Sequence, residues 1–196
     1  MQNWCKPNAE AKLVWIMLRC RPICGNAKHL RTKNGQSFYK LQIMIAEEKV
    51  ALYKQAREKI DMYVCVKGDV WARLATIEAV LHQTIPYYFW TGVYVLIDED
   101  LIVRSYQGPV ACQLLKRHAG VCWASIDSGK TVVVPDVEEF PGHIACSSLS
   151  KSEIVVPLRD ENGNIFGCFD IDSTELNSFD ETDAKCLEEI LNDVLF

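Results

Sequence analysis

Residues 153–173 read EIVVPLRDENGNIFGCFDIDS, with an apolar run on each side of Asn162-Gly163. An Asn-Gly pair in this setting is a strong signal for a β-hairpin, because both residues tolerate the positive φ angles of a tight turn. The stretch predicts two antiparallel strands joined at Asn162-Gly163, and the rest of the fold is interpreted around them.

The same hairpin predicts a cluster of carboxylates. Alternate side chains of a strand share a face, so Asp170 and Asp172 should point one way, and Phe169 and Ile171 the other. Glu153 and Asp172 lie equally far from the turn centre, so Glu153 should come near both aspartates. Crowded carboxylates cannot all ionise easily, and one should hold a proton at neutral pH. A solvated strand end without chemical function is the alternative.

Further strands are expected on both sides of the hairpin. Residues 90–108 indicate a second hairpin around Asp98-Glu99-Asp100, and residues 109–117 a short strand that continues into a turn. A brief strand is expected in TVVVPDV, residues 131–137.

Helices are expected before and after the strands along the chain, and a shorter one between them. Apolar residues at spacings of three and four predict amphipathic helices at 46–63, 70–83 and 180–195, and a shorter helix is expected at 120–129. The fold class is therefore α+β, with a central antiparallel sheet of five to six strands and the N-terminal and C-terminal helices packed on one face.

Charge divides the chain into two parts. Residues 1–45 hold eight Lys and Arg against one acid, whereas residues 46–196 hold 13 Lys and Arg against 25 Asp and Glu. The acidic domain expected at 46–196 argues against nucleic acid as a partner, since phosphate binding needs a basic surface. Residues 1–45 are expected to be a basic extension without a settled structure, and an organelle-targeting segment is the alternative. No apolar run is long enough to span a membrane, and the expected location is the cytoplasm.

The chain has nine cysteines, and no secretory signal is recognisable. An odd number of thiols in this context argues against a disulfide framework and favours redox or metal chemistry. No C-x-x-C pair is present, and neither Cys20-x3-Cys24 with His29 nor His143 with Cys146 completes a set of four ligands. We therefore expect no metal site.

Three cysteines stand in segments with glycine or proline, where loops often carry reactive groups. They are Cys112 in QGPVAC, Cys122 in AGVCW and Cys146 in FPGHIACSS, residues 140–148. The alternative is that each is a small apolar filler of the core. That alternative fits Cys168, within a strand, and Cys186, within the last helix, better than it fits the three loop cysteines.

Aromatic residues cluster where the first strand begins, and Trp90 and Tyr94 are an even number of residues apart, so they should lie on the same face of it. They are candidates for the wall of a small pocket that accepts a thioether or methyl group. Aromatic stripes more often belong to a core, which is the alternative.

Six motifs together resemble a known family. In order, WTGVY, YQGPVAC, GVCW, PDVEEFPGHIAC, SEIVVP and FGCFDIDS are similar to motifs of the free methionine-(R)-sulfoxide reductases, which are single GAF domains. The resemblance covers roughly residues 46–196 and does not reach residues 1–45. It departs from the family at the Trp-Ala-Ser that follows Cys122, where many members have Gly-Thr-Ala, and at Cys168, where an aliphatic residue is common.

The resemblance implies a GAF-like fold and reduction of free L-methionine-(R)-sulfoxide to methionine. It implies that Cys146 is the catalytic thiol and becomes a sulfenic acid. Cys112 or Cys122 would then form a disulfide with it, and thioredoxin would restore the thiols without a bound cofactor.

The resemblance also assigns the binding groups. It implies that the acids bind the substrate's ammonium and protonate its sulfoxide oxygen, that the aromatic pair contacts its methyl end, and that the protein dimerises. The acids are Glu153, Asp170 and Asp172, and the aromatic pair is Trp90 and Tyr94.

A non-catalytic GAF domain is the alternative. It would act as a small-ligand sensor, or as a redox sensor in which a Cys146–Cys112 disulfide is the signal. Sensor modules usually occur in longer chains beside an output domain, and they have no need of three loop cysteines beside an acid cluster. The reductase is therefore the expectation.

Overall fold

The computed structural model describes residues 44–64, 69–143 and 147–195. Within these ranges six strands form one antiparallel sheet, in the order β3-β2-β1-β6-β5-β4. The strands are β1 Trp90–Ile97, β2 Asp100–Gln107, β3 Leu114–Leu115, β4 Val132–Val134, β5 Ser152–Arg159 and β6 Ile165–Ser173. The predicted α+β class with a central antiparallel sheet is confirmed. The extension expected at 1–45 lies outside the described residues up to residue 43.

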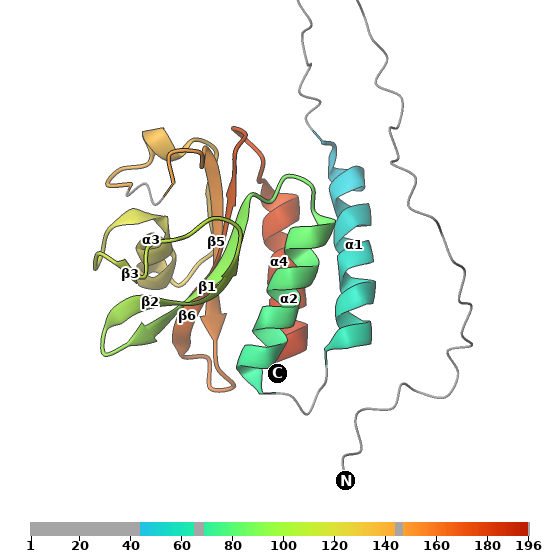
Figure 1. Cartoon of the computed structure of the whole chain (residues 1–196), viewed down its shortest axis with the longest axis horizontal. Coiled ribbons are helices and arrows are strands. Elements are labelled where there is room, and N and C mark those ends of the chain that lie inside the picture. Colours follow the sequence, from blue (N-terminus) through green and yellow to red (C-terminus); the bar gives the residue numbers. More distant parts are fainter. Residues whose placement is uncertain (1–43, 65–68, 144–146, 196) are drawn as a thin grey trace, which may run out of the picture. The chain divides into compact units, whose positions relative to one another are not determined.

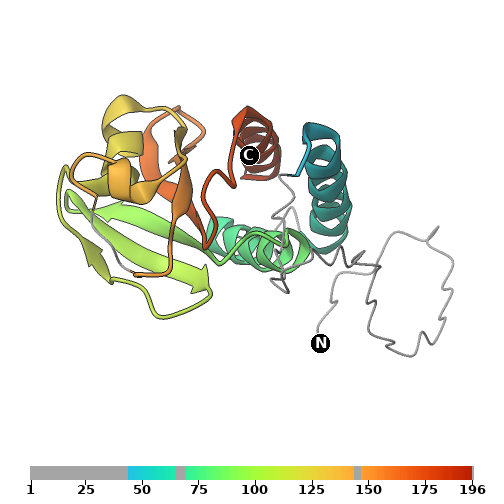
Figure 2. The ribbon, with the colours of Figure 1, turned by 90° about the horizontal axis from the view of Figure 1, so that it is seen from above.

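Three long helices cover one face of the sheet, as predicted (Figures 1 and 2). They are α1 Ala46–Tyr63, α2 Val70–Thr84 and α4 Glu181–Leu195. Their apolar stripes pack on the side chains that β1, β5 and β6 direct to that face, and this forms the main core. Fully buried members from these elements include Ile60, Leu74, Ile77, Leu81, Leu187, Val93, Ile154, Phe169 and Ile171.

The opposite face carries the shorter elements. Helix α3, Gly120–Ser128, lies over β5 and β6 on the side away from the long helices, and the 3-10 turn η1, Val137–Glu139, follows β4 (Figure 1). A second apolar cluster fills the space between these elements and the sheet, including Val121, Trp123 and Val155. The predicted carboxylates Glu153, Asp170 and Asp172 lie in this thinner layer.

The β5–β6 hairpin has the predicted register but a different turn. Glu153 pairs with Asp172, as expected from the distance of each to Asn162-Gly163. The chain turns through residues 160–164 rather than through a two-residue loop, because the Asp160 carboxylate accepts hydrogen bonds from the backbone N–H groups of Asn162 and Asn164, at 2.9 and 2.8 Å. An irregularity beside Arg159 absorbs the extra residue and preserves the register.

The segment 109–117 forms less strand than expected. Only Leu114–Leu115 pair with β2, opposite Leu101 and Ile102. Gly108 has φ +114°, and Pro109 has no N–H to donate, so the chain leaves the sheet after β2 before returning to it. The residues between β2 and β3 thereby form a loop that includes Cys112.

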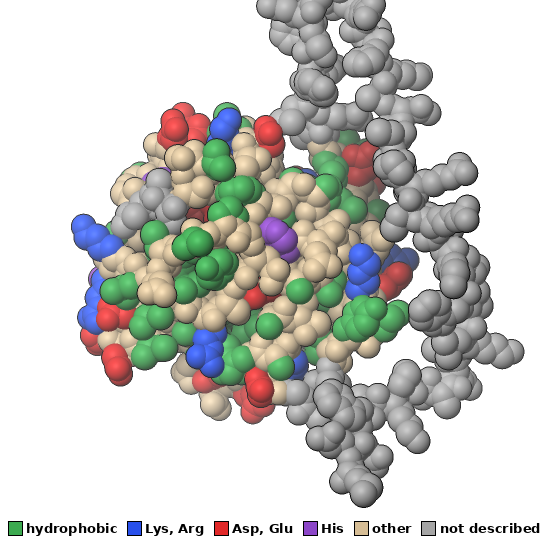
Figure 3. Space-filling model, viewed as in Figure 1, with side chains coloured by type: hydrophobic (Ala, Val, Ile, Leu, Met, Phe, Trp, Pro, Cys, Tyr) green, Lys and Arg blue, Asp and Glu red, His purple; other side chains and the backbone are tan. Residues whose placement is uncertain are grey.

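Basic side chains and helix length can be judged for the part of the chain that the structure describes. Lys and Arg side chains are spread singly over the face seen in Figure 3 and form no basic patch there. Among the helices in the described ranges, none has the length and apolarity to cross a membrane.

One buried acid outside the polar cluster predicts a pH-dependent stability. Glu78 of α2 is 1% exposed; Ser105 Oγ donates to its Oε1 at 2.7 Å, and its buried Oε2 has no hydrogen-bond partner within the described part of the chain. Burial raises the pKa of Glu78 from 4.5 to about 7. The folded protein therefore keeps a proton that the unfolded chain releases first, and stability falls as pH rises from about 4.5 to about 7.

We expect Glu78→Gln to remove this contribution. Between pH 4.5 and pH 7.5 the wild type should lose about 3 kcal/mol of unfolding free energy relative to Glu78→Gln. Urea denaturation across this range measures it, with the exposed Glu58→Gln on α1 as the control. Parallel curves for Glu78→Gln and wild type would refute the expectation.

Candidate active site

Two neighbouring strands, β5 and β6, bring the predicted acids together, and β1 pairs with β6 beside them. Glu153 on β5 pairs with Asp172 on β6, and Asp172 pairs in turn with Trp90 on β1. In the next row Asp170 pairs with Gly92 of β1. Residues opposite one another on adjacent strands have their Cβ atoms about 5 Å apart, so the register alone crowds the three carboxylates on the face away from the long helices.

These acids line a small cavity of about 60 Å³. Six of the eight predicted site residues lie in its wall: Trp90, Tyr94, Cys122, Glu153, Asp170 and Asp172. Ala111, beside the predicted Cys112, also lines it. Cys146 lies outside the described residues, but His143 and Ser147, on either side of that gap, both line the cavity.

An aromatic stack forms one wall. Trp90 lies between Tyr94 and Tyr106, with ring centroids 5.9 and 5.6 Å apart. Gly92 makes this possible, because a Cβ added there would lie 2.4 Å from the Trp90 ring. The Gly of the W-x-G-x-Y segment therefore lets the indole fold back across the strand.

The same aromatic residues hold the loop that carries Cys112. Trp90 Nε1 donates to the carbonyl oxygen of Pro109 at 3.1 Å, and the Tyr94 hydroxyl donates to the carbonyl oxygen of Cys112 at 3.1 Å. Cys112 is disulfide-bonded. Among the other described cysteines, Cys122, Cys168 and Cys186 are free thiols and so are not its partner.

The three carboxylates have different affinities for protons. Burial and the neighbouring carboxylates raise the pKa of Glu153 and of Asp170 well above their ordinary values, and both side chains are 6% exposed. Burial raises the pKa of Asp172 only to about 6. At neutral pH Asp172 is therefore largely ionised, whereas the Glu153–Asp170 pair retains a proton.

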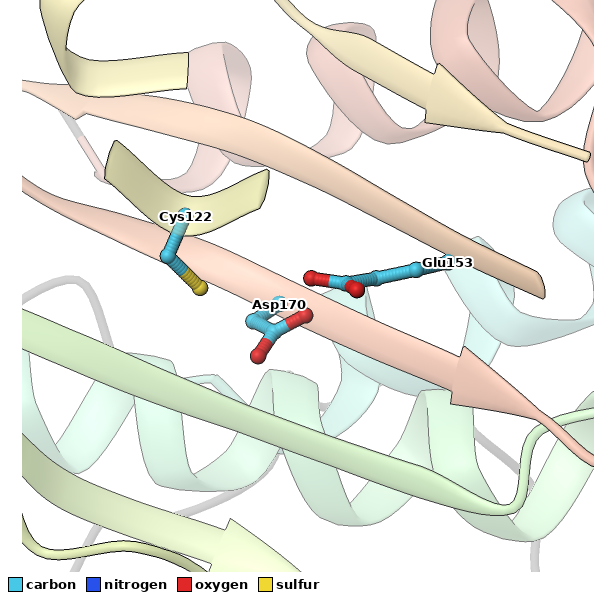
Figure 4. A group of neighbouring side chains, drawn as sticks. All are labelled: Cys122, Glu153 and Asp170. Carbon is cyan, nitrogen blue, oxygen red and sulfur yellow. The ribbon is translucent and has the colours of Figure 1, made fainter. Parts of the chain in front are cut away.

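Cys122 projects from α3 toward Glu153 and Asp170 (Figure 4). A hydrogen bond with the Cys168 thiol, and then burial, raise the pKa of Cys122 well above its ordinary value. Cys122 is therefore a protonated thiol at neutral pH and a poor nucleophile. Cys168 is fully buried, in keeping with a packing role, but it also touches a site residue.

Sequence reasoning missed several residues of this site. Tyr106 completes the stack, and Ser150 lines the cavity and hydrogen-bonds Asp172. His143 also lines the cavity, with its Nε2 buried and without a hydrogen-bond partner among the described residues. Burial lowers the pKa of His143, so its ring is neutral at neutral pH. Cys168 could have been found from strand alternation, because it shares its face with Asp170. Ser150 and His143 each lie three residues from a predicted site residue, Glu153 and Cys146, whereas Tyr106 depends on the pairing of β2 with β1.

Comparison with known proteins gives consistent results. The family described as GAF domain matches residues 75–196. GAF domain-containing protein A of Dictyostelium discoideum is 46% identical over 140 residues, which cover 71% of this chain and 87% of that protein. Free methionine-R-sulfoxide reductase of Escherichia coli is 32% identical over 143 residues, covering 73% of this chain and 86% of that protein.

A solved structure extends the comparison to three dimensions. Free methionine-R-sulfoxide reductase from Neisseria meningitidis, in complex with its substrate, superposes with a TM-score of 0.70 at 43% identity. The match covers 75% of this chain and 87% of that one. The sheet and helices described above therefore have the GAF fold.

Proposed function

The chain belongs to the free methionine-(R)-sulfoxide reductase family of GAF domains, and from this premise we propose that it reduces free L-methionine-(R)-sulfoxide with Cys146 as the attacking thiol. One observation carries the proposal. Acidic and aromatic walls meet in a single small cavity, and the residues on either side of the Cys146 segment line it.

The cavity suits a free amino acid whose side chain ends in a methyl sulfoxide. The ionised Asp172 carboxylate offers a partner for the substrate's ammonium, which a peptide-bound methionine lacks. The Trp90 and Tyr94 side chains that line the cavity suit the sulfur-bound methyl group. Selection of the free amino acid follows from this charge pairing.

The Glu153–Asp170 pair is suited to act as the general acid. It holds a proton at neutral pH because of its burial, and Asp170 Oδ1 has no hydrogen-bond partner among the described residues. Protonation of the sulfoxide oxygen by this pair would make the sulfur electrophilic as the Cys146 thiolate attacks it. The S–O bond of the substrate then breaks, methionine leaves, and Cys146 carries the oxygen as a sulfenic acid.

Cys112 is proposed as the resolving thiol. Its sulfur attacks the Cys146 sulfenic acid, a disulfide forms and water leaves, so one sulfoxide and two thiols yield methionine, water and one disulfide. Two observations support this choice over Cys122: Cys112 is disulfide-bonded, whereas Cys122 is a free thiol with a raised pKa.

A thioredoxin dithiol would then reduce the disulfide in a reducing compartment such as the cytoplasm, and no bound cofactor takes part. A homodimer, which the family resemblance implies, belongs to the same proposal. Size-exclusion chromatography with light scattering tests the assembly.

The decisive experiment supplies the R and S forms of free methionine sulfoxide separately, with thioredoxin, its reductase and NADPH. We expect wild type to consume the R form alone and to leave N-acetylated methionine sulfoxide unchanged. Cys146→Ser should abolish turnover, because it removes the attacking sulfur. Cys186→Ser, which changes a free cysteine of α4 outside the cavity, should retain it.

Two results would contradict the proposal. Normal turnover by Cys146→Ser would exclude that residue as the nucleophile. No turnover of either form by folded, fully reduced wild type would favour the sensor alternative, in which the same cavity binds a ligand without chemistry.

A further inference from the structure

Three potential metal ligands converge beneath α3. The Cys122 sulfur and one carboxylate oxygen each of Glu153 and Asp170 all lie within 4.8 Å of one another, and all three residues are buried. They come from α3, β5 and β6, and their side chains point toward one another (Figure 4).

A second observation is that one oxygen atom of this group is buried without a hydrogen bond. Asp170 is 6% exposed and forms side-chain hydrogen bonds with Cys122 and Glu153, but its buried Oδ1 has no hydrogen-bond partner among the described residues. An unpaired buried carboxylate oxygen is costly, so a cation that enters the group gains a partner already desolvated and directed at it.

The donor set selects the class of cation. An ammonium group gains from the carboxylates but nothing from a thiol, whereas Mg²⁺ and Ca²⁺ prefer oxygen ligands alone. Zn²⁺ binds sulfur and carboxylate oxygen together, at about 2.3 and about 2.1 Å, which places tetrahedral donors about 3.5 Å apart. Small side-chain rotations would bring the three donor atoms to that spacing.

We infer that the reduced protein binds one Zn²⁺ through Cys122, Glu153 and Asp170, with the fourth position open to water, and that zinc competes there with the substrate. The ion displaces the Cys122 proton and the proton shared by the two carboxylates. Zinc binding itself is independent of the reaction, and only the competition rests on the proposed function.

Co²⁺ provides the spectroscopic test on reduced, full-length protein freed of reductant. We expect one Co²⁺ per chain, with a sulfur-to-cobalt charge-transfer band that Zn²⁺ displaces. Cys122→Ser should abolish the band, and Cys186→Ser should leave it unchanged. Asp170→Asn should weaken zinc binding by more than roughly 10-fold, the lower end of what even outer partners of a metal contribute.

A measurement on wild type alone covers the case in which a variant fails to fold. Zn²⁺, but not Mg²⁺, should slow alkylation of Cys122, read by peptide mass spectrometry. An unchanged alkylation rate at saturating Zn²⁺, or a thiolate band that persists in Cys122→Ser, would overturn the inference.

Competition separates this inference from the proposed function. Free methionine-(R)-sulfoxide should raise the apparent dissociation constant for Zn²⁺. If zinc binds with the predicted thiolate signature and the sulfoxide has no effect on it, the zinc site stands and the placement of the substrate among these acids is wrong.

Discussion

Asp172→Asn is expected to lower kcat/KM for free methionine-(R)-sulfoxide by about 100-fold at pH 7.5. The physical reason is the loss of the ionised carboxylate that would face the substrate's ammonium. Truncating one partner of a buried charge pair typically costs about 2–5 kcal/mol, and about 1.4 kcal/mol corresponds to a tenfold change. Asparagine keeps the size of the side chain, so the wall of the cavity should remain intact.

The pH profile identifies the residue responsible. Burial raises the pKa of Asp172 to about 6, and protonation below that value removes its charge. Wild-type kcat/KM should therefore fall roughly tenfold per unit below pH 6, and Asp172→Asn should lack this acid limb. Glu161→Gln, an exposed acid in the β5–β6 turn, serves as the control and should keep both rate and profile. An unaltered acid limb in Asp172→Asn would assign the titration to another group.

The sequence predicts this part of the site well because the relevant information is local. The register of one hairpin places Glu153 opposite Asp172, and strand parity puts Asp170 on the same face. The prediction of a tight turn at Asn162-Gly163 was wrong in length. The Asp160 carboxylate accepts hydrogen bonds from backbone N–H groups and so stabilises a longer turn. The predicted strand register is still correct, because the irregularity beside Arg159 compensates for the longer turn.

Contacts between distant segments were beyond the sequence pattern. Tyr106 joins the aromatic stack because β2 pairs with β1 across a register shift between Val93 and Tyr94. The proposed zinc ligands come from three separate elements, so no spacing along the chain would reveal them. Cys146, the proposed attacking thiol, lies outside the described residues, and its role remains a prediction from the family motif.

A buried ion pair predicts the largest effect on stability. Lys49 of α1 is 3% exposed, and its ammonium lies 2.5 Å from Asp183 Oδ2 at the start of α4, which is fully buried. The hydroxyls of Tyr53 and Tyr87 donate to the other oxygen of Asp183, at 2.9 and 2.5 Å. The Asp180 backbone N–H also donates to Oδ2, at 2.8 Å, so this aspartate caps the start of α4 as well as anchoring α1.

Asp183→Asn should destabilise the protein by about 3–5 kcal/mol, because it removes the buried counter-charge of the Lys49 ammonium and leaves only the half-exposed Asp180 carboxylate, at 2.8 Å. Asp193→Asn is the matched control: Arg57 Nη1 and Asp193 Oδ2 also join α1 to α4, at 3.0 Å, but on the surface. An exposed pair of this kind contributes at most about 1 kcal/mol. Urea denaturation of both variants measures the contrast, and equal losses would show that burial does not set the strength of this link.

The double variant Lys49→Met/Asp183→Asn, which keeps an oxygen acceptor at position 183, separates the contribution of the ion pair from the cost of leaving one of its charges unpaired. Removing both charges leaves no buried ion without a counter-charge. The decrease in unfolding free energy should therefore be smaller than for Asp183→Asn alone. A double variant at least as unstable as the single one would mean that the ion pair stabilises the packing of α1 on α4. A smaller loss would mean that the pair mainly specifies how the two helices meet, while the apolar core supplies the stability.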